Sequence, residues 1–174
     1  SSIPLVTLGT FLLWFGWFGF NGFSQLAMGT FDDVNAISKI AVNTHLAGAA
    51  GTVAAAVVTR LLGGKTDIVM MLNGALAGLV AITAGCNSMT SVTSIFVGIV
   101  GAIIAVTVNE ILNKFEIDDV VGAVPVHLAA GIWGTLAVGF FSDLSILDNG
   151  LDRISQVKTQ FIGVISIGAF TFIS

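Results

Sequence analysis

The sequence has 174 residues, of which 55% are hydrophobic and only 9% are charged, and its mean hydropathy is +1.00. Soluble domains carry about 25% charged residues, so this chain could not cover a water-facing surface, and lipid is the environment that suits it. The net charge of −4 excludes the clustered positive charge that a nucleic-acid partner requires.

Long apolar stretches follow one another along the whole chain. A helix needs about 20 apolar residues to cross a bilayer, and five stretches reach that length while a sixth runs to the last residue. Strands are disfavoured because the stretches lack the alternation of barrel strands, and because backbone groups in lipid must be satisfied within each segment. We therefore predict an all-α, multi-pass membrane protein, forming one domain over residues 1–174, with helices at about 3–29, 36–63, 66–86, 91–114, 118–141 and 157–174.

The ends of the sequence and its charges leave two questions open. The chain starts without Met and is apolar at both ends, which favours a piece of a longer protein. If the helices alternate in direction, three basic residues fall on each side of the membrane, so the positive-inside rule does not orient them. Those residues are Arg60, Lys65 and Lys114 on one side, and Lys39, Arg153 and Lys158 on the other.

The foremost functional candidate is His127, close to the middle of the fifth predicted helix. Polar groups at membrane depth are costly and usually face a protein interior or a cavity. Helical spacing predicts that His127 shares a stripe with small residues, from which its ring could project into a lumen: Ala123, Gly131 and Gly134. Pro125 is expected to free the carbonyl of Val121 and to bend the helix before the histidine. The alternative is a histidine that packs against a neighbouring helix.

His45 is the only other histidine, and it lies in the second predicted helix. Two histidines could relay a proton, because imidazoles titrate near physiological pH. The spacing gives no evidence that His45 contacts His127, however. An interhelical hydrogen bond near a helix end explains His45 equally well.

The first predicted helix carries an aromatic face with a hydroxyl group. Trp17, Phe20 and Ser24 fall at i, i+3 and i+7, so they share one side of the helix. Ring faces attract a small cation and a hydroxyl oxygen accepts a hydrogen bond from it. Ordinary aromatic packing is the alternative, and spacing alone favours it. The sequence shows no paired-cysteine metal site, phosphate loop or serine nucleophile, so we expect no metal, no cofactor and no enzymatic activity, an intramembrane hydrolase included.

Three segments together resemble the ammonium transporter family (Amt/Mep/Rh), and its Amt branch most. They are GWFGFN (16–21), NGALAGLVAITAGC (73–86) and DDVVGAVPVHLAAGIWGTLAVGFF (118–141), and their order and spacing also match over essentially the whole chain. The resemblance implies eleven membrane helices in two inverted halves, assembled as a homotrimer with one pore per subunit. This chain then corresponds to helices six to ten and the start of eleven, with helix six running from inside to outside.

The resemblance also implies roles for single residues. His127 matches the second of two pore histidines, Phe20 one of two stacked gate phenylalanines, and Ser24 the serine that holds ammonium at the outer recruitment site. Trp17 lies in the same vestibule motif. His45 does not match the first pore histidine, because it falls on helix seven rather than helix five. One departure is that Val120 and Val121 follow the paired aspartates, where many members have proline.

These expectations combine into a predicted function. Ammonium would be recruited and deprotonated at the outer vestibule, and ammonia would pass through an apolar pore lined by histidine. Expected partners are ammonium or ammonia, the lipid bilayer of the cell membrane, two further copies of the chain, and a PII-type regulator or a fused signalling domain. The alternative is an Amt-like ammonium sensor domain of a signalling protein.

Overall fold

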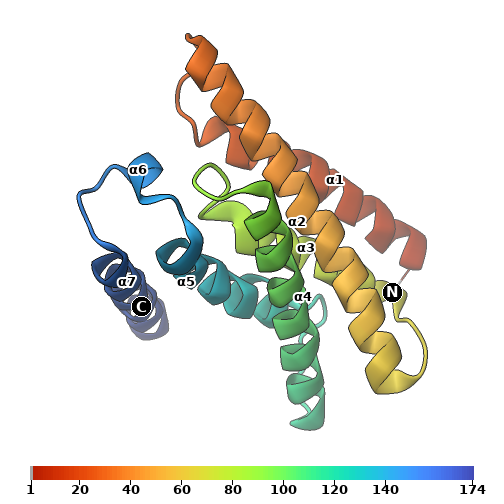
Figure 1. The fold of residues 1–174 in the computed structure, drawn as a ribbon. Coiled ribbons are helices and arrows are strands. Elements are labelled where there is room, and N and C mark those ends of the chain that lie inside the picture. Colours follow the sequence, from red (N-terminus) through yellow and green to blue (C-terminus); the bar gives the residue numbers. More distant parts are fainter. Residues whose placement is uncertain (1) are drawn as a thin grey trace.

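The computed structural model describes residues 2–174, and all its regular elements are helices (Figure 1). Five spans are long and apolar enough to cross a membrane when η1 and α5 are counted as one, and α3 is a shorter apolar helix. The predicted all-α, multi-pass membrane fold is therefore confirmed. The elements are α1 Ile3–Phe23, α2 Phe31–Gly63, α3 Ile68–Thr83, α4 Ser91–Lys114, the π-helix η1 Val124–Ala129, α5 Ala130–Phe141, α6 Leu144–Leu147 and α7 Arg153–Ile173.

Helices α2, α3 and α4 pack on one another at the centre of the molecule. Helix α1 runs alongside α2 and α3, while η1 and α5 pack on α3 and α4. Helix α7 contacts α5 and lies at the edge of the molecule away from α1 (Figure 1). Helix α3 therefore lies between the first helix and the helix that carries His127.

Small residues allow the three central helices to approach closely. An added Cβ at Gly78 of α3 or at Gly98 of α4 would collide with the backbone of Ala47 in α2. Close backbone approach through glycine and alanine is the usual way in which membrane helices pack. Part of the abundant glycine in this sequence therefore serves these close helix contacts.

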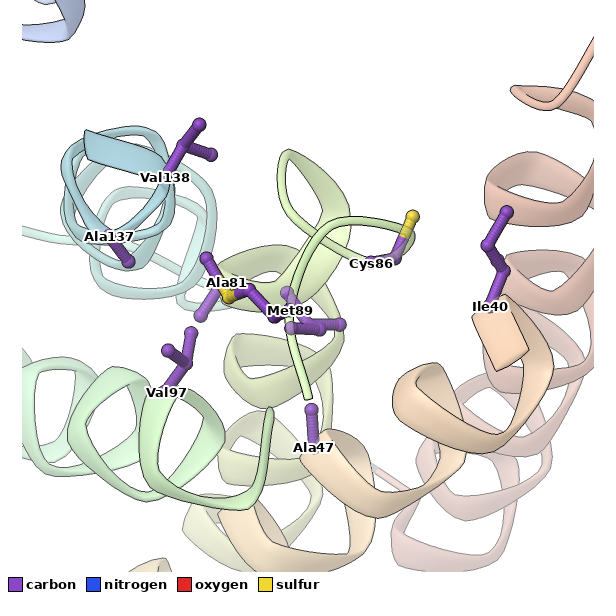
Figure 2. Close-up of a cluster of buried hydrophobic side chains, with 9 residues drawn as sticks. Ile40, Ala47, Ala81, Cys86, Met89, Val97, Ala137 and Val138 are labelled. Carbon is purple, nitrogen blue, oxygen red and sulfur yellow. The ribbon is translucent and has the colours of Figure 1, made fainter. Parts of the chain in front are cut away.

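The hydrophobic core surrounds Met89, which is fully buried although it lies in the loop between α3 and α4 (Figure 2). Asn43 of α2 holds this loop in place. Its side-chain amide donates to the carbonyl oxygens of Cys86, at 2.9 Å, and Met89, at 3.0 Å, and its oxygen accepts from the Ser91 hydroxyl at 3.0 Å. The cluster consists of Ile40, Ala47, Ala81, Ile82, Cys86, Met89, Val97, Ala137 and Val138.

Local capping sets several helix ends differently from the predicted ranges. Helix α1 ends at Phe23 rather than near residue 29, and Leu26 then has a φ of 60°. Helix α2 begins at Phe31 rather than 36, because Thr30 and Asp33 form a reciprocal capping box. Helix α7 begins at Arg153 rather than 157, because the Asp152 carboxylate accepts a hydrogen bond from the Ser155 amide at 2.8 Å.

Candidate functional site

The helix that carries His127 starts later than its apolar run suggests. Gly122 has a φ of 72°, which ends the preceding turn, and the helix begins at the next residue. The Asp119 carboxylate accepts hydrogen bonds from the amides of Ala123 and Val124, both at 2.8 Å. These two bonds satisfy donors that have no partner within a first helical turn.

Pro125 occupies that first turn, and its position corrects the expected kink. The first helical bond runs from the Val126 amide to the Gly122 carbonyl, at 3.1 Å. Proline is tolerated in a first turn because its missing N–H would have no helical partner there. The prediction that Pro125 frees the carbonyl of Val121 and bends the helix is wrong, because no helical turn precedes it.

His127 is exposed within the π-helix η1 and lines a cavity of about 590 Å³ between this helix and α7. The cavity wall is largely apolar, and its other polar side chains are Thr135, Gln160 and Thr171. Gly131 lines the same cavity, as predicted, but Gly134 is buried against α3. The predicted common stripe is thus not observed as a whole, because Gly134 lies three residues after Gly131 in α5 and so faces about 60° away from it around the helix axis.

The aromatic face of α1 is fixed by a hydrogen bond to α3. The indole N–H of Trp17 donates to the Thr83 hydroxyl at 2.8 Å, and that hydroxyl donates to the Leu79 carbonyl at 2.8 Å. The rings of Trp17 and Phe20 have centroids 6.0 Å apart at 55°, and Phe20 is 65% exposed. The Ser24 hydroxyl, also exposed, donates to the Phe20 carbonyl at 3.0 Å. The structure therefore brings the three predicted residues together at one end of α1.

Helix α3 connects this aromatic face to the helix of His127. Thr83 contacts Trp17. Val80, which lies three residues earlier in α3, is beside Gly131, because a Cβ added at Gly131 would be 3.7 Å from the Val80 Cγ1. Both α3 residues are half-buried, whereas most of the residues between them and around them are buried. Sequence reasoning missed Val80 and Thr83. A threonine in an apolar helix is the one signal that could have indicated Thr83.

His45 lies elsewhere, in the groove between α2 and α1. Its ring centroid is 5.5 Å from that of Trp14 and 6.3 Å from that of Phe18. The cavity that it lines, of about 260 Å³, has only aromatic residues of α1 as its other walls, whereas His127 lines the cavity beside α7. The two histidines of this chain therefore do not share a cavity.

A polar cavity of about 540 Å³ opens at the other end of α3. Carboxylates and amides of α3, α4 and the segment before η1 line it, together with the first half of α1. Across residues 2–174, no group of three or more His, Cys, Asp or Glu residues is arranged to hold a metal ion. The polar lining residues are Thr10, Asp67, Asn73, Asn109, Glu110, Asn113 and Asp119.

The sequence and the helix arrangement are both similar to those of one known family. The model of the Ammonium Transporter Family matches residues 1–174, the whole sequence. The chain belongs to the ammonium transporter family. Ammonium transporter Amt2 of Archaeoglobus fulgidus is 46% identical over 142 residues, which are 82% of this chain and 30% of Amt2. The chain thus spans less than a third of the length of this relative.

Solved structures of family members have the same fold. A sensor Amt protein aligns with a TM-score of 0.87 at 37% identity, over 95% of this chain and 40% of that protein. Mep2 of Candida albicans aligns with a TM-score of 0.88 at 28% identity, over 99% of this chain and 39% of Mep2. The helices of this Amt/Mep segment therefore have the family's arrangement, and the segment forms part of a multi-pass membrane protein.

Proposed function

We propose that this chain is one part of a pathway that carries ammonium or ammonia across the membrane, with His127 in the dry section of the pathway. One observation carries the proposal. In a chain whose whole length matches the ammonium transporter family, the imidazole near the start of the fifth span is exposed on the wall of a largely apolar cavity.

The chemistry follows from the cost of moving a charge through an apolar conduit. Transfer of a bare cation out of water costs tens of kcal/mol in the idealised Born limit, and potassium faces the same barrier as ammonium. Ammonium can leave its proton behind and cross as neutral ammonia, whereas potassium has no such route. A neutral imidazole has one ring nitrogen that donates and one that accepts, so a histidine on the apolar wall can hold ammonia by hydrogen bonds.

Recruitment would take place at the end of α1 that carries the aromatic face. Trp17 and Phe20 present ring faces that attract a cation, and the Thr83 hydroxyl fixes the orientation of the indole. The Ser24 hydroxyl donates its hydrogen bond to the Phe20 carbonyl, so the lone pairs of its oxygen can accept a hydrogen bond from ammonium. We propose that Phe20 is a gate residue between this entrance and the cavity.

The proposed partners follow from the family and from one apolar groove. A groove of about 570 Å³ between α2 and α4 is lined only by Leu, Ala, Val and Ile side chains, which suits lipid or a further copy of the chain. Together with the family membership, this groove supports assembly as a homotrimer in the bilayer. A PII-type regulator is a further proposed partner of the full-length protein.

A sensing role is the second candidate, and the similarity to a sensor Amt protein favours it. Such a protein would bind ammonium at the same entrance and pass its state to an output domain. The two candidates differ in flux: a transporter carries the bound ammonium or ammonia across the membrane, and a sensor binds ammonium with little or no flux.

Reconstitution of the full-length protein into liposomes separates the two candidates. We expect ammonium gradients to change the internal pH of the liposomes at a rate that saturates with ammonium, and Phe20→Ala and Ser24→Ala to alter that rate. The matched control is Phe23→Ala, an exposed phenylalanine on the same helix end. Ammonium binding without flux would overturn the transport proposal and support the sensor.

A further inference from the structure

The buried face of the helix that carries His127 shifts at the π-turn. In α5, Ala130 and Gly134 are buried, and Gly134 packs on the backbone of Ala81 in α3. An α-helix turns by about 100° per residue. Extending α5 backwards with that spacing would place His127 about 40° from the centre of this buried face, and Val126 about 60° from it. An uninterrupted α-helix would therefore press the imidazole toward α3.

The structure shows the opposite arrangement. Val126 is 1% exposed and His127 is exposed to the cavity beside α7. Val126 packs with Ala77 of α3 and Ala105 of α4, in the same cluster as Ala130. His127, which an α-helix would place nearer the centre of the buried face, is exposed, and Val126 is buried instead.

The π-turn accounts for this exchange. The Ala130 amide donates to the Pro125 carbonyl, five residues back, instead of four. One additional residue in the turn rotates the preceding residues by up to about 100° relative to α5. Pro125 is itself fully buried, so both residues before His127 anchor the turn against α3 and α4.

We infer that the π-turn at Val124–Ala129 is a positioning device that turns His127 away from α3 and into the cavity, with Pro125 and Val126 as its positioning residues. This inference rests on the proposed function, because it explains how the imidazole comes to face the pathway. π-Turns within α-helices often accompany functional sites, and here the extra residue has a specific geometric consequence.

Two matched deletions in the full-length protein test the inference. Removing either Val124 or Leu128 takes one residue out of the π-turn and allows a continuous α-helix. Without Val124, His127 stays three residues before Ala130 and turns toward α3. Without Leu128, it lies two residues before Ala130 and points away from α3.

We expect ammonium flux through the Val124-deletion protein to fall to that of His127→Ala. Flux through the Leu128-deletion protein should be about tenfold higher than through the Val124-deletion protein, or more, because only the first keeps a hydrogen bond to ammonia worth about 1.4 kcal/mol. In the Val124 deletion, the exchange His127→Leu with Leu128→His moves the imidazole back outward and should restore flux. A defect of folding alone would not be rescued in this way. Equal flux in the two deletions, with both proteins assembled, would overturn the inference.

Thiol labelling provides a second measurement that needs no deletion. In a full-length background with Cys86→Ser and without other native cysteines, we expect Ag⁺ to react with the His127→Cys variant about tenfold faster or more than with Val126→Cys, because only the first faces the cavity. Equal reactivity would contradict the π-turn's role even if both deletions fail to assemble. Unchanged transport in His127→Ala would instead refute the proposed function, and the labelling ratio would still report the direction of the side chain.

Discussion

Replacing Gly134 by alanine should force α5 away from α3. A Cβ at this position would lie 2.8 Å from the Ala81 Cα and 2.9 Å from the Ala81 carbonyl carbon. Carbon atoms pack at about 3.5–4.0 Å, so the helices would have to separate by roughly 1 Å. Overpacking of this kind costs about 1–3 kcal/mol, and the better helix propensity of alanine offsets at most about 1 kcal/mol of it.

Gly131→Ala is the matched control, one turn earlier on the same helix. Its Cβ would be 3.7 Å from the Val80 Cγ1, an ordinary contact, so we expect no loss of stability. Thermal unfolding of the purified full-length protein, followed by size-exclusion chromatography, should show a midpoint roughly 1–3 °C lower for Gly134→Ala than for Gly131→Ala. Equal midpoints would show that close approach at Gly134 does not hold α5 against α3.

Three further predictions concern hydrogen bonds in other parts of the molecule. Thr83→Val leaves the Trp17 indole N–H without its acceptor, so we expect the free energy of unfolding in denaturant to fall by about 1–3 kcal/mol and the KM for ammonium to rise. Unchanged values of both would contradict the proposed role of Thr83. Asn43→Leu removes two buried hydrogen bonds to the α3–α4 loop and a half-buried one from Ser91 at the start of α4. It should cost about 3 kcal/mol or more, measured by the same unfolding, and a loss below about 1 kcal/mol would show that the loop does not depend on this amide. Hydrogen bonds from the Ser155 hydroxyl and amide lower the pKa of Asp152 below the ordinary value of a free aspartate, so the cap is complete at neutral pH and is lost as the pH falls through that lowered pKa. The protection of the Ser155 amide, which is its exchange rate compared with that of an unstructured peptide at the same pH, should therefore fall in acid. Asp152→Asn, which can still cap, should remove that pH dependence of the protection.

The membrane fold could be predicted because it depends on bulk properties. Apolar length and the scarcity of charge determine that the chain forms membrane helices, and these properties survive any error in detail. The capping box of Thr30 and Asp33 was also visible as residue types at the required spacing, although the predicted start at residue 36 did not use it. Helix ends depend on single side chains, which average hydropathy does not register.

The arrangement around His127 could be predicted only in part. The cost of a polar group at membrane depth singled out His127 in the sequence, but the structure places it near the start of its span, and the predicted stripe assumed 3.6 residues per turn throughout. A π-turn changes that spacing by one residue, and it accompanies the packing of Val126 against α3 and α4, which a periodicity cannot reveal. The burial of the loop with Met89 could not be predicted either, because it depends on the amide of Asn43 in another helix, which pairs the loop backbone.

The most direct test of the central claim is the selectivity of the full-length protein with and without the His127 imidazole. In liposomes with equal gradients of ammonium and potassium, we expect the unmodified protein to carry ammonium and to exclude potassium. We expect His127→Ala to lower the ammonium flux about tenfold or to admit potassium. Unchanged ammonium flux together with unchanged exclusion of potassium in His127→Ala would contradict the account.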